Sequence, residues 1–249
     1  MNNRDLISQY VDTGLQIPEY QVNLLTDNLL QTYLRKRMIV ISRSQWGELG
    51  VYEYRLMSED NQKTYIGWLV KRHDYIPQNM LEYSSDEVKE FYIDLVISKN
   101  DYINLGNFSE LTDELKLKYL KYRIDTGKGF DMSFVKNFTP DMMYQFYYIF
   151  ATSPKSISEE RYDLLPDKLK QVYLEHHIES SDTYKQYSDR TPELKYKYIT
   201  AIKNRMLNKE LLEITPDDLA MVYLKQRMSQ GWDLTPSEKA RYESITNEQ

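Results

Sequence analysis

A tyrosine that recurs at nearly constant spacing constrains the fold of this chain more than any other feature of its sequence. We call these residues the anchors: Tyr33, Tyr65, Tyr92, Tyr119, Tyr147, Tyr173, Tyr198 and Tyr223. After a longer first step, successive anchors lie roughly 25 to 28 residues apart, a fixed period typical of helical repeats. The sequence therefore predicts an array in which each period is one supersecondary unit.

Each anchor lies in a segment that predicts a long helix. The segment begins with Ser or Thr as a cap, tolerates Pro at the first helical position and carries acidic residues in its first turn, as at Thr112 and Asp113. Apolar residues four before, one after and five after the anchor share one helical face, as do Leu115, Leu120 and Ile124 around Tyr119. We expect this face to be buried between neighbouring repeats.

A shorter apolar segment precedes each long helix and predicts a second helix in the period. Its marker residues are Val22, Tyr54, Leu81, Phe108, Val135, Tyr162, Tyr187, Leu211 and Tyr242. Starts at Pro18, Pro77 and Pro236 fit the preference of Pro for a first helical turn. The chain is therefore predicted to be all-α, a right-handed superhelical α-solenoid of about eight two-helix repeats. We expect one domain over residues 1–249, with an insertion at residues 41–53 in the longer first step.

The alternation of a long with a short helix at this period resembles leucine-rich-variant and HEAT-like arrays in architecture only. The repeat is shorter than tetratricopeptide and pentatricopeptide repeats and lacks their signature residues, so no specific family is matched. The resemblance implies a shape and no function.

Composition excludes several classes of protein. The chain has only 8 Gly and 8 Pro among its 249 residues, which argues against a turn-rich β fold. It has no Cys, so disulfides, zinc knuckles and iron–sulfur ligation are excluded, and a reducing compartment is favoured. No signal core opens the chain and no stretch approaches ~18 apolar residues, which predicts no membrane span. We expect a cytoplasmic protein, in a host cell if the Tyr-, Lys- and Asn-rich chain is viral or from a phage.

The sequence offers no constellation of residues that predicts catalysis, so we expect a protein that is not an enzyme, with no cofactor and no metal site. Adjacent residues on a helix point about 100° apart, so His176 and His177 cannot chelate one ion together. They are predicted to face solvent near a helix C-terminus, where a cation suits the macrodipole. A protein-binding or scaffolding role remains the favoured class.

Apolar residues on the expected polar face of the long helices are the candidate partner-binding site. They are Leu117, Met142, Ile149, Tyr196 and Met221. Such a contiguous patch would mark a protein partner or self-association, whereas scattered apolar surface residues are ordinary in folded proteins.

A nucleic-acid-binding solenoid is the alternative, because basic residues gather in the last turns of the long helices. This predicted basic edge consists of Arg35, Lys121, Arg123, Lys203, Arg205, Lys225 and Arg227. Complementation of the helix macrodipole explains the same pattern without any ligand. A net charge of −6 disfavours nucleic acid, and Arg123 and Arg227 follow their anchors by four residues, which places their stems near the core face.

Overall fold

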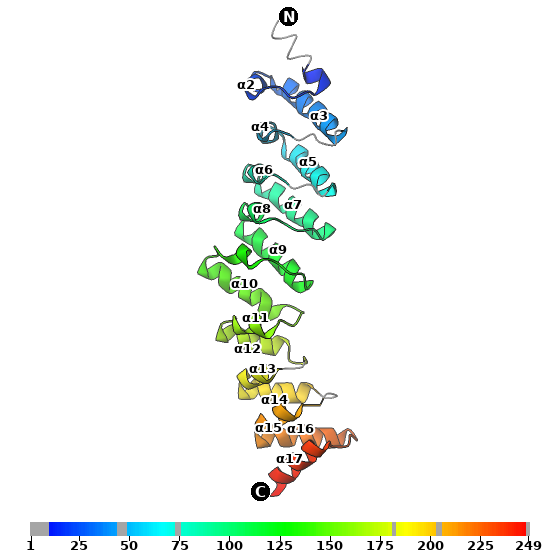
Figure 1. Cartoon of the computed structure of the whole chain (residues 1–249), viewed down its shortest axis with the longest axis vertical. Helices are drawn as coiled ribbons and strands as arrows, with labels where there is room; N and C mark the ends of the chain where they lie inside the picture. The colour runs from blue at the N-terminus through cyan, green and yellow to red at the C-terminus, as the bar shows by residue number, and fades with distance from the viewer. Residues whose placement is uncertain (1–9, 44–48, 73–75, 181–182, 203–205, 248–249) are drawn as a thin grey trace, which may run out of the picture. The chain divides into compact units, whose positions relative to one another are not determined.

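The structure is a computed structural model that describes residues 10–43, 49–72, 76–180, 183–202 and 206–247. Every regular element in these ranges is a helix, so the all-α prediction is confirmed (Figure 1). Short helices alternate with long ones, and a helix pair here means a short helix and the long helix that follows it. No helix in the same ranges is both long enough and apolar enough to cross a membrane.

The chain divides into two compact units. The N-terminal unit comprises residues 1–122 and 130–138, and the C-terminal unit comprises residues 123–129 and 139–249. The short helices that begin in the first are α2 (Glu19–Val22), α4 (Val51–Arg55), α6 (Gln78–Glu82), α8 (Leu105–Ser109) and the 3-10 helix η1 (Met132–Val135). Its long helices are α3 (Asp27–Arg43), α5 (Glu59–Lys71), α7 (Asp86–Lys99) and α9 (Asp113–Asp125), whose last three residues belong to the second unit.

The C-terminal unit continues the alternation. Its long helices are α10 (Pro140–Thr152), α12 (Asp167–His176), α14 (Pro192–Ala201) and α16 (Asp217–Ser229). Its short helices are α11 (Glu159–Asp163), α13 (Tyr184–Asp189) and α15 (Lys209–Ile214), and α17 (Pro236–Asn247) follows them. The predicted starts after Ile17, Ile76 and Leu234 are confirmed, because α2, α6 and α17 begin at Glu19, Gln78 and Pro236.

Within each unit, like helices pack on like. In the N-terminal unit α5 packs on α7, while α4, α6, α8 and η1 follow one another along the other side (Figure 1). In the C-terminal unit α10 packs on α12, α14 on α16 and α13 on α15. The long helices bury the predicted stripe, and Leu34, Ile66, Ile93, Leu120 and Leu224 are all fully buried one position after their anchors.

The anchor hydroxyls hold the two helices of a pair together. In five pairs the Tyr Oη accepts a hydrogen bond from the backbone N–H of the residue 16 positions earlier, at distances between 3.0 and 3.4 Å. The donors are Ile17, Leu49, Ile103, Ile157 and Leu207. Because a buried N–H without a partner costs free energy, the hydroxyl explains why Tyr rather than Phe fills these positions.

One predicted anchor is wrong by a single residue. Phe146 is fully buried, whereas Tyr147 is only half-buried. With Phe146 in place of Tyr147, the anchors from Tyr65 to Tyr173 follow one another every 27 residues. The phenyl ring of Phe146 fills the anchor position of α10 without a hydroxyl group. This shift of register by one residue changes the predicted binding site.

The longer first step between anchors, from Tyr33 to Tyr65, is explained in part by the length of α3. The predicted insertion at residues 41–53 includes the end of α3, which runs for 17 residues to Arg43, and the first turn of α4 from Val51. Residues 44–48, which include Trp46 and Gly47, lie outside the described ranges.

Candidate interaction surface

The five predicted partner-binding residues differ in how far they are exposed to solvent. Met142 on α10 is buried, with 7% of its surface exposed, and Met221 on α16 is half-buried against the core of the C-terminal unit. Ile149 on α10 is half-buried as well, and Leu117 on α9 is half-buried in the N-terminal unit. Tyr196 on α14 alone is well exposed, at 52%. The predicted place of Met142 on an exposed, partner-binding face is therefore wrong.

The register shift explains Met142. Counted from Tyr147 it lies five residues before the anchor, on the polar face, but counted from Phe146 it lies four residues before. That second position is the one occupied by the buried residues Val88, Leu115 and Leu169 in other long helices. Met142 is thus a core residue of α10.

The predicted basic edge separates into exposed and packed members. Arg35, Lys121 and Lys225 are exposed on α3, α9 and α16. Arg123 is half-buried and its Nε donates to the Gly129 carbonyl at 3.1 Å. Lys203 and Arg205 lie outside the described residues.

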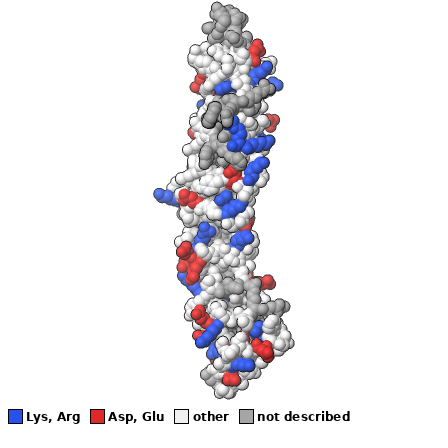
Figure 2. Space-filling view, turned by 45° about the vertical axis from the view of Figure 1, so that its right-hand side comes forward, with Lys and Arg blue, Asp and Glu red and all other residues white. Residues whose placement is uncertain are grey.

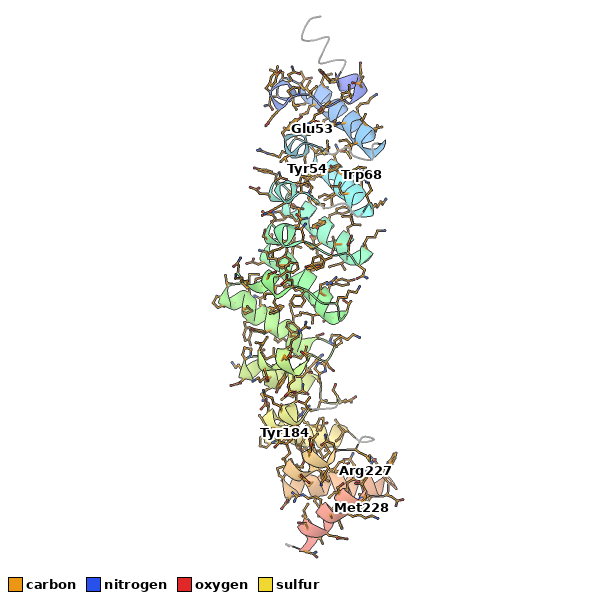
Figure 3. All side chains as sticks on the ribbon, in the orientation of Figure 1. Glu53, Tyr54, Trp68, Tyr184, Arg227 and Met228 are labelled. Atoms are coloured by element: carbon orange, nitrogen blue, oxygen red, sulfur yellow. The ribbon has the colours of Figure 1, made fainter. Side chains whose placement is uncertain are left out.

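Arg227, labelled in Figure 3, is buried at 3% exposure and does not belong to an exposed edge. Its guanidinium lies 5.0 Å from the centre of the Trp232 ring, and its Nε lies 3.5 Å from Glu238 Oε1. Packing of its stem near the core face, as its spacing from Tyr223 predicts, is confirmed.

Arg227 belongs to a buried network that we call a polar joint. Tyr223 Oη donates to Glu238 Oε1 at 2.6 Å and accepts from the Leu207 N–H, while Glu238 Oε2 accepts from the Thr235 N–H at 2.7 Å. Burial, followed by the hydrogen bond to Glu238, raises the pKa of Tyr223 above its ordinary value of 10.0. Burial raises the pKa of Glu238, but its hydrogen bonds and Arg227 outweigh that effect and hold the pKa below 4.5.

The same polar joint occurs near the start of the chain. Tyr33 Oη donates to Glu53 Oε1 and accepts from the Ile17 N–H, and Arg37 Nε lies 3.0 Å from the same carboxylate oxygen. Glu53 Oε2 accepts from the Gly50 N–H at 2.8 Å. Glu53, labelled in Figure 3, has no exposed surface. Both networks combine an anchor, the Arg four residues later and the third residue of the next helix, α4 or α17, so these charged groups are buried in the packing between helices.

The predicted solvent-facing histidine pair is wrong in one member. His176 is exposed, but His177 is buried at 7% exposure with its ring 4.4 Å from that of Tyr173. Burial, followed by the charge of His176, lowers the pKa of His177 below 6.5. His177 follows Tyr173 by four residues, the position of Arg37 and Arg227 in the polar joints.

Exposed apolar side chains lie on or directly beside α2, α6, α8 and η1 of the N-terminal unit. We call this set the short-helix row: Tyr20, Leu24, Tyr83, Leu105 and Met132. Each is between 45% and 70% exposed. The Arg55 guanidinium lies 4.3 Å from the centre of the Tyr83 ring, so the row carries an aromatic–cation contact between α4 and the C-cap of α6.

The sequence holds a signal for the row, although the repeat pattern does not reveal it. In a helix, residues two positions from a buried marker point away from it, so apolar residues at those positions of a one-turn helix face outward. Tyr20 and Leu24 lie two residues to either side of Val22, and Tyr83 lies two after Leu81. Tyr184 on α13 of the C-terminal unit, labelled in Figure 3, is similarly 52% exposed.

Charge is segregated along the long helices of the N-terminal unit. Exposed acids lie in their first turns, and exposed bases lie near the C-termini of α5, α7 and α9: Lys71, Arg72, Lys99 and Lys121. Arg35, predicted in a last turn, lies with Lys36 in the middle of α3, because that helix runs on to Arg43. Lys and Arg atoms gather over this unit, in the upper part of Figure 2. Such a surface attracts negatively charged groups and also complements the macrodipoles of the same helices.

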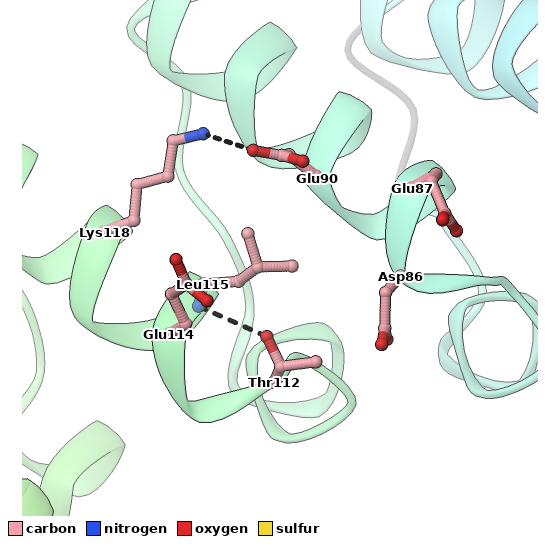
Figure 4. A pocket seen from close by; sticks show the side chains of 7 residues that line it. All are labelled: Asp86, Glu87, Glu90, Thr112, Glu114, Leu115 and Lys118. Carbon is pink, nitrogen blue, oxygen red and sulfur yellow. Dashed lines mark hydrogen bonds and ion pairs between the residues drawn. The ribbon is translucent and has the colours of Figure 1, made fainter.

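An acidic hollow lies between the first turns of α7 and α9 (Figure 4). Asp86, Glu87 and Glu114 line it, and Lys118 closes one side through ion pairs to Glu90 at 3.2 Å and to Asp94 at 2.7 Å. Its acids belong to helix N-termini, where they complement the macrodipole. Among the side chains that the structure describes, no three His, Cys, Asp or Glu residues gather as a metal site.

Comparisons with protein-family models, curated proteins and solved structures find no match, which confirms the prediction that no specific family is matched.

Proposed function

We propose that this chain is a non-catalytic helical-repeat protein that binds a protein partner and serves as a scaffold. In this proposal residues 1–249 form one right-handed superhelical α-solenoid of about eight two-helix repeats. The role is placed in the cytoplasm, where a chain without cysteine has no disulfide to lose.

The short-helix row is the observation that carries this proposal. Large apolar side chains that remain exposed on or beside several short helices of one unit support a protein-interaction surface. Tyr is enriched at such interfaces, and so is Arg, which the row includes through the contact of Arg55 with Tyr83. Repeat arrays use extended surfaces of this kind to bind partners.

The anchor hydrogen bonds support the repeat architecture. The same Tyr Oη to backbone N–H bond spans 16 residues in pairs from both units, at Tyr33 and Tyr119 in one and at Tyr173 and Tyr223 in the other. A contact that recurs at one sequence separation indicates that one supersecondary structure is repeated.

A nucleic-acid-binding solenoid is the second candidate, favoured by the exposed bases at the long-helix C-termini of the N-terminal unit. Its affinity would fall steeply with salt, because phosphate contacts release counterions. An apolar interface on the short-helix row would respond weakly to the same change. The net charge of −6 favours the protein partner.

Affinity capture from the native host tests the proposal, with partners identified by mass spectrometry. The test variant changes Leu24, Leu105 and Met132 of the short-helix row to Gln. The matched control changes Tyr144, Tyr148 and Met228, exposed on long helices of the C-terminal unit, to Gln. Met228 is labelled in Figure 3.

The proposal expects the row variant to lose a specific captured protein, or its own oligomer, while the control variant keeps it and both melt like the wild type. Capture that survives in the row variant, or that nuclease treatment abolishes, would contradict the proposal.

A further inference from the structure

An apolar hollow lies between α3 and α5 in the N-terminal unit. It is lined by Met38, Ile39, Thr64, Tyr65 and Trp68. The Trp68 ring, labelled in Figure 3, stacks on that of Tyr65 with their centres 6.0 Å apart, while Ile39 opposite is 46% exposed. The cavity of about 210 Å³ is smaller than the roughly 300 to 1,000 Å³ of small-molecule pockets, which suits one inserted side chain.

Basic groups rim this hollow on the side of the helix C-termini. The Arg72 guanidinium lies 4.3 Å from the centre of the Trp68 ring. Lys71 is exposed three residues after Trp68, so helical spacing places it beside the lining residues, whereas Arg35 lies one turn before Ile39 and its Nε donates to the Gln31 carbonyl. Asp60, one turn before Thr64, marks the opposite end of the hollow.

We propose that this hollow binds an acidic peptide segment of a partner protein and takes one apolar side chain, such as Leu, between Ile39 and Trp68. The inference rests on the proposed protein-binding function and names the chemistry of the bound segment. Carboxylates of the segment face Lys71 and Arg72, and the apolar side chain covers the exposed surface of Ile39.

A peptide fits these observations better than a nucleic acid. Single-stranded nucleic acids stack bases on aromatic faces in basic grooves, but the Trp68 ring already contacts Tyr65 and Arg72. The remaining lining is aliphatic at Met38 and Ile39, which matches an aliphatic side chain.

Fluorescence anisotropy with labelled probes and the full chain tests the proposal. One probe is a 12-residue peptide of Asp, Glu and Gly with a single central Leu, and its matched control has Ala in place of Leu. A 12-nucleotide oligothymidylate is the third probe. The Leu peptide should bind about tenfold more tightly than the Ala peptide, because only Leu buries apolar surface in the hollow.

Three variants assign the binding to the hollow. Ile39→Gln should remove the preference for Leu over Ala, since it makes the exposed wall polar. Lys71→Glu combined with Arg72→Glu should weaken both peptides by about tenfold. Lys99→Glu changes an exposed base at the end of α7, outside the lining, and should leave the preference for Leu unchanged.

Equal binding of the Leu and Ala peptides to the wild type would overturn the proposal without reference to any variant. Tighter binding of the oligothymidylate than of the Leu peptide would overturn it as well. Either result leaves the proposed function standing if the short-helix row variant still loses its captured partner, so the two failures are distinguishable.

Discussion

The joints between successive helix pairs share one geometry but differ in chemistry. At the polar joint of the first described pair, Arg37 and Glu53 fill the position four residues after the anchor and the third position of the next short helix. One pair later, Leu69 and Met80 occupy the same two positions, and both are buried. The comparison shows that a buried ion pair and an apolar pair can serve the same packing role.

At other joints the two positions do not always match in polarity, since buried Val96 is followed by buried Asn107 at the third position of α8. Ile202 pairs in sequence with Leu211, both buried, whereas at Phe150 the partner position holds Arg161, whose guanidinium lies 5.7 Å from the centre of the Phe150 ring. A buried charge without a partner is costly, which explains why Arg37 and Glu53 occur together at the first polar joint.

Removal of an anchor should break a joint of either kind and gives the largest expected effect. Phe146→Ala leaves a cavity in the C-terminal unit and should lower the free energy of unfolding by about 3 to 5 kcal/mol. Tyr147→Ala, its matched control, removes a half-buried ring and should cost less. Urea unfolding measures both. A larger loss at Tyr147 would restore the original register and reject Phe146 as the anchor.

Breaking the polar joint on one side should be nearly as costly. Glu53→Leu leaves Arg37 buried without its carboxylate and should cost about 3 to 5 kcal/mol. Met80→Leu at the equivalent apolar position should cost less than about 1.5 kcal/mol.

The double variant Arg37→Leu with Glu53→Met copies the apolar joint into the polar one. It should recover most of the stability that Glu53→Leu loses, because no buried charge remains. Equal losses in the single and double variants, measured by the same unfolding experiment, would show that the two positions act independently.

Loss of one anchor hydroxyl should have a smaller effect. Tyr119→Phe keeps the ring but leaves the Ile103 N–H without its acceptor, which should cost about 1 to 3 kcal/mol. Amide hydrogen exchange should quicken at Ile103 more than at Leu207, whose acceptor Tyr223 is intact. Unchanged exchange at Ile103 would show that this hydrogen bond does not hold the helix pair.

Acid should weaken the polar joint of the C-terminal unit, and this is the smallest of the predicted effects on stability. The pKa of Glu238 is lowered in the folded chain, so its contribution is complete above pH 4.5 and is lost as the pH falls through the folded pKa. The melting temperature should therefore decline more in the wild type than in Glu238→Gln as the pH drops below 4.5. Parallel curves would show that the carboxylate charge does not stabilise the fold.

Much of this fold is readable from the sequence because its signals are local. Caps such as Thr112, the spacing of the anchors and the apolar stripe of the long helices follow from helix geometry. Tyr147 lies beside Phe146, so the recurrence of tyrosine indicates the wrong residue as the anchor of α10. The regular step of 27 residues indicates Phe146 instead.

The candidate surfaces were harder to predict because exposure depends on packing between elements. Arg37 and Arg227 have side chains typical of the surface, and only the structure shows that each contacts a glutamate of the next helix. The hollow beside Trp68 likewise needs two helices, α3 and α5, from different helix pairs. Neither contact can be predicted from the helical wheel of one helix, because each involves side chains of two helices.

Site-specific photo-crosslinking in the native host tests the central claim, that this chain binds a protein through its short-helix row. A benzoylphenylalanine at Leu24 or Leu105 would report contacts of the row, and the same group at Gln145, exposed on α10, would be the control. The account predicts a discrete protein adduct from both row positions and none from the control. Adducts only at Gln145, or only with nucleic acid, would contradict it.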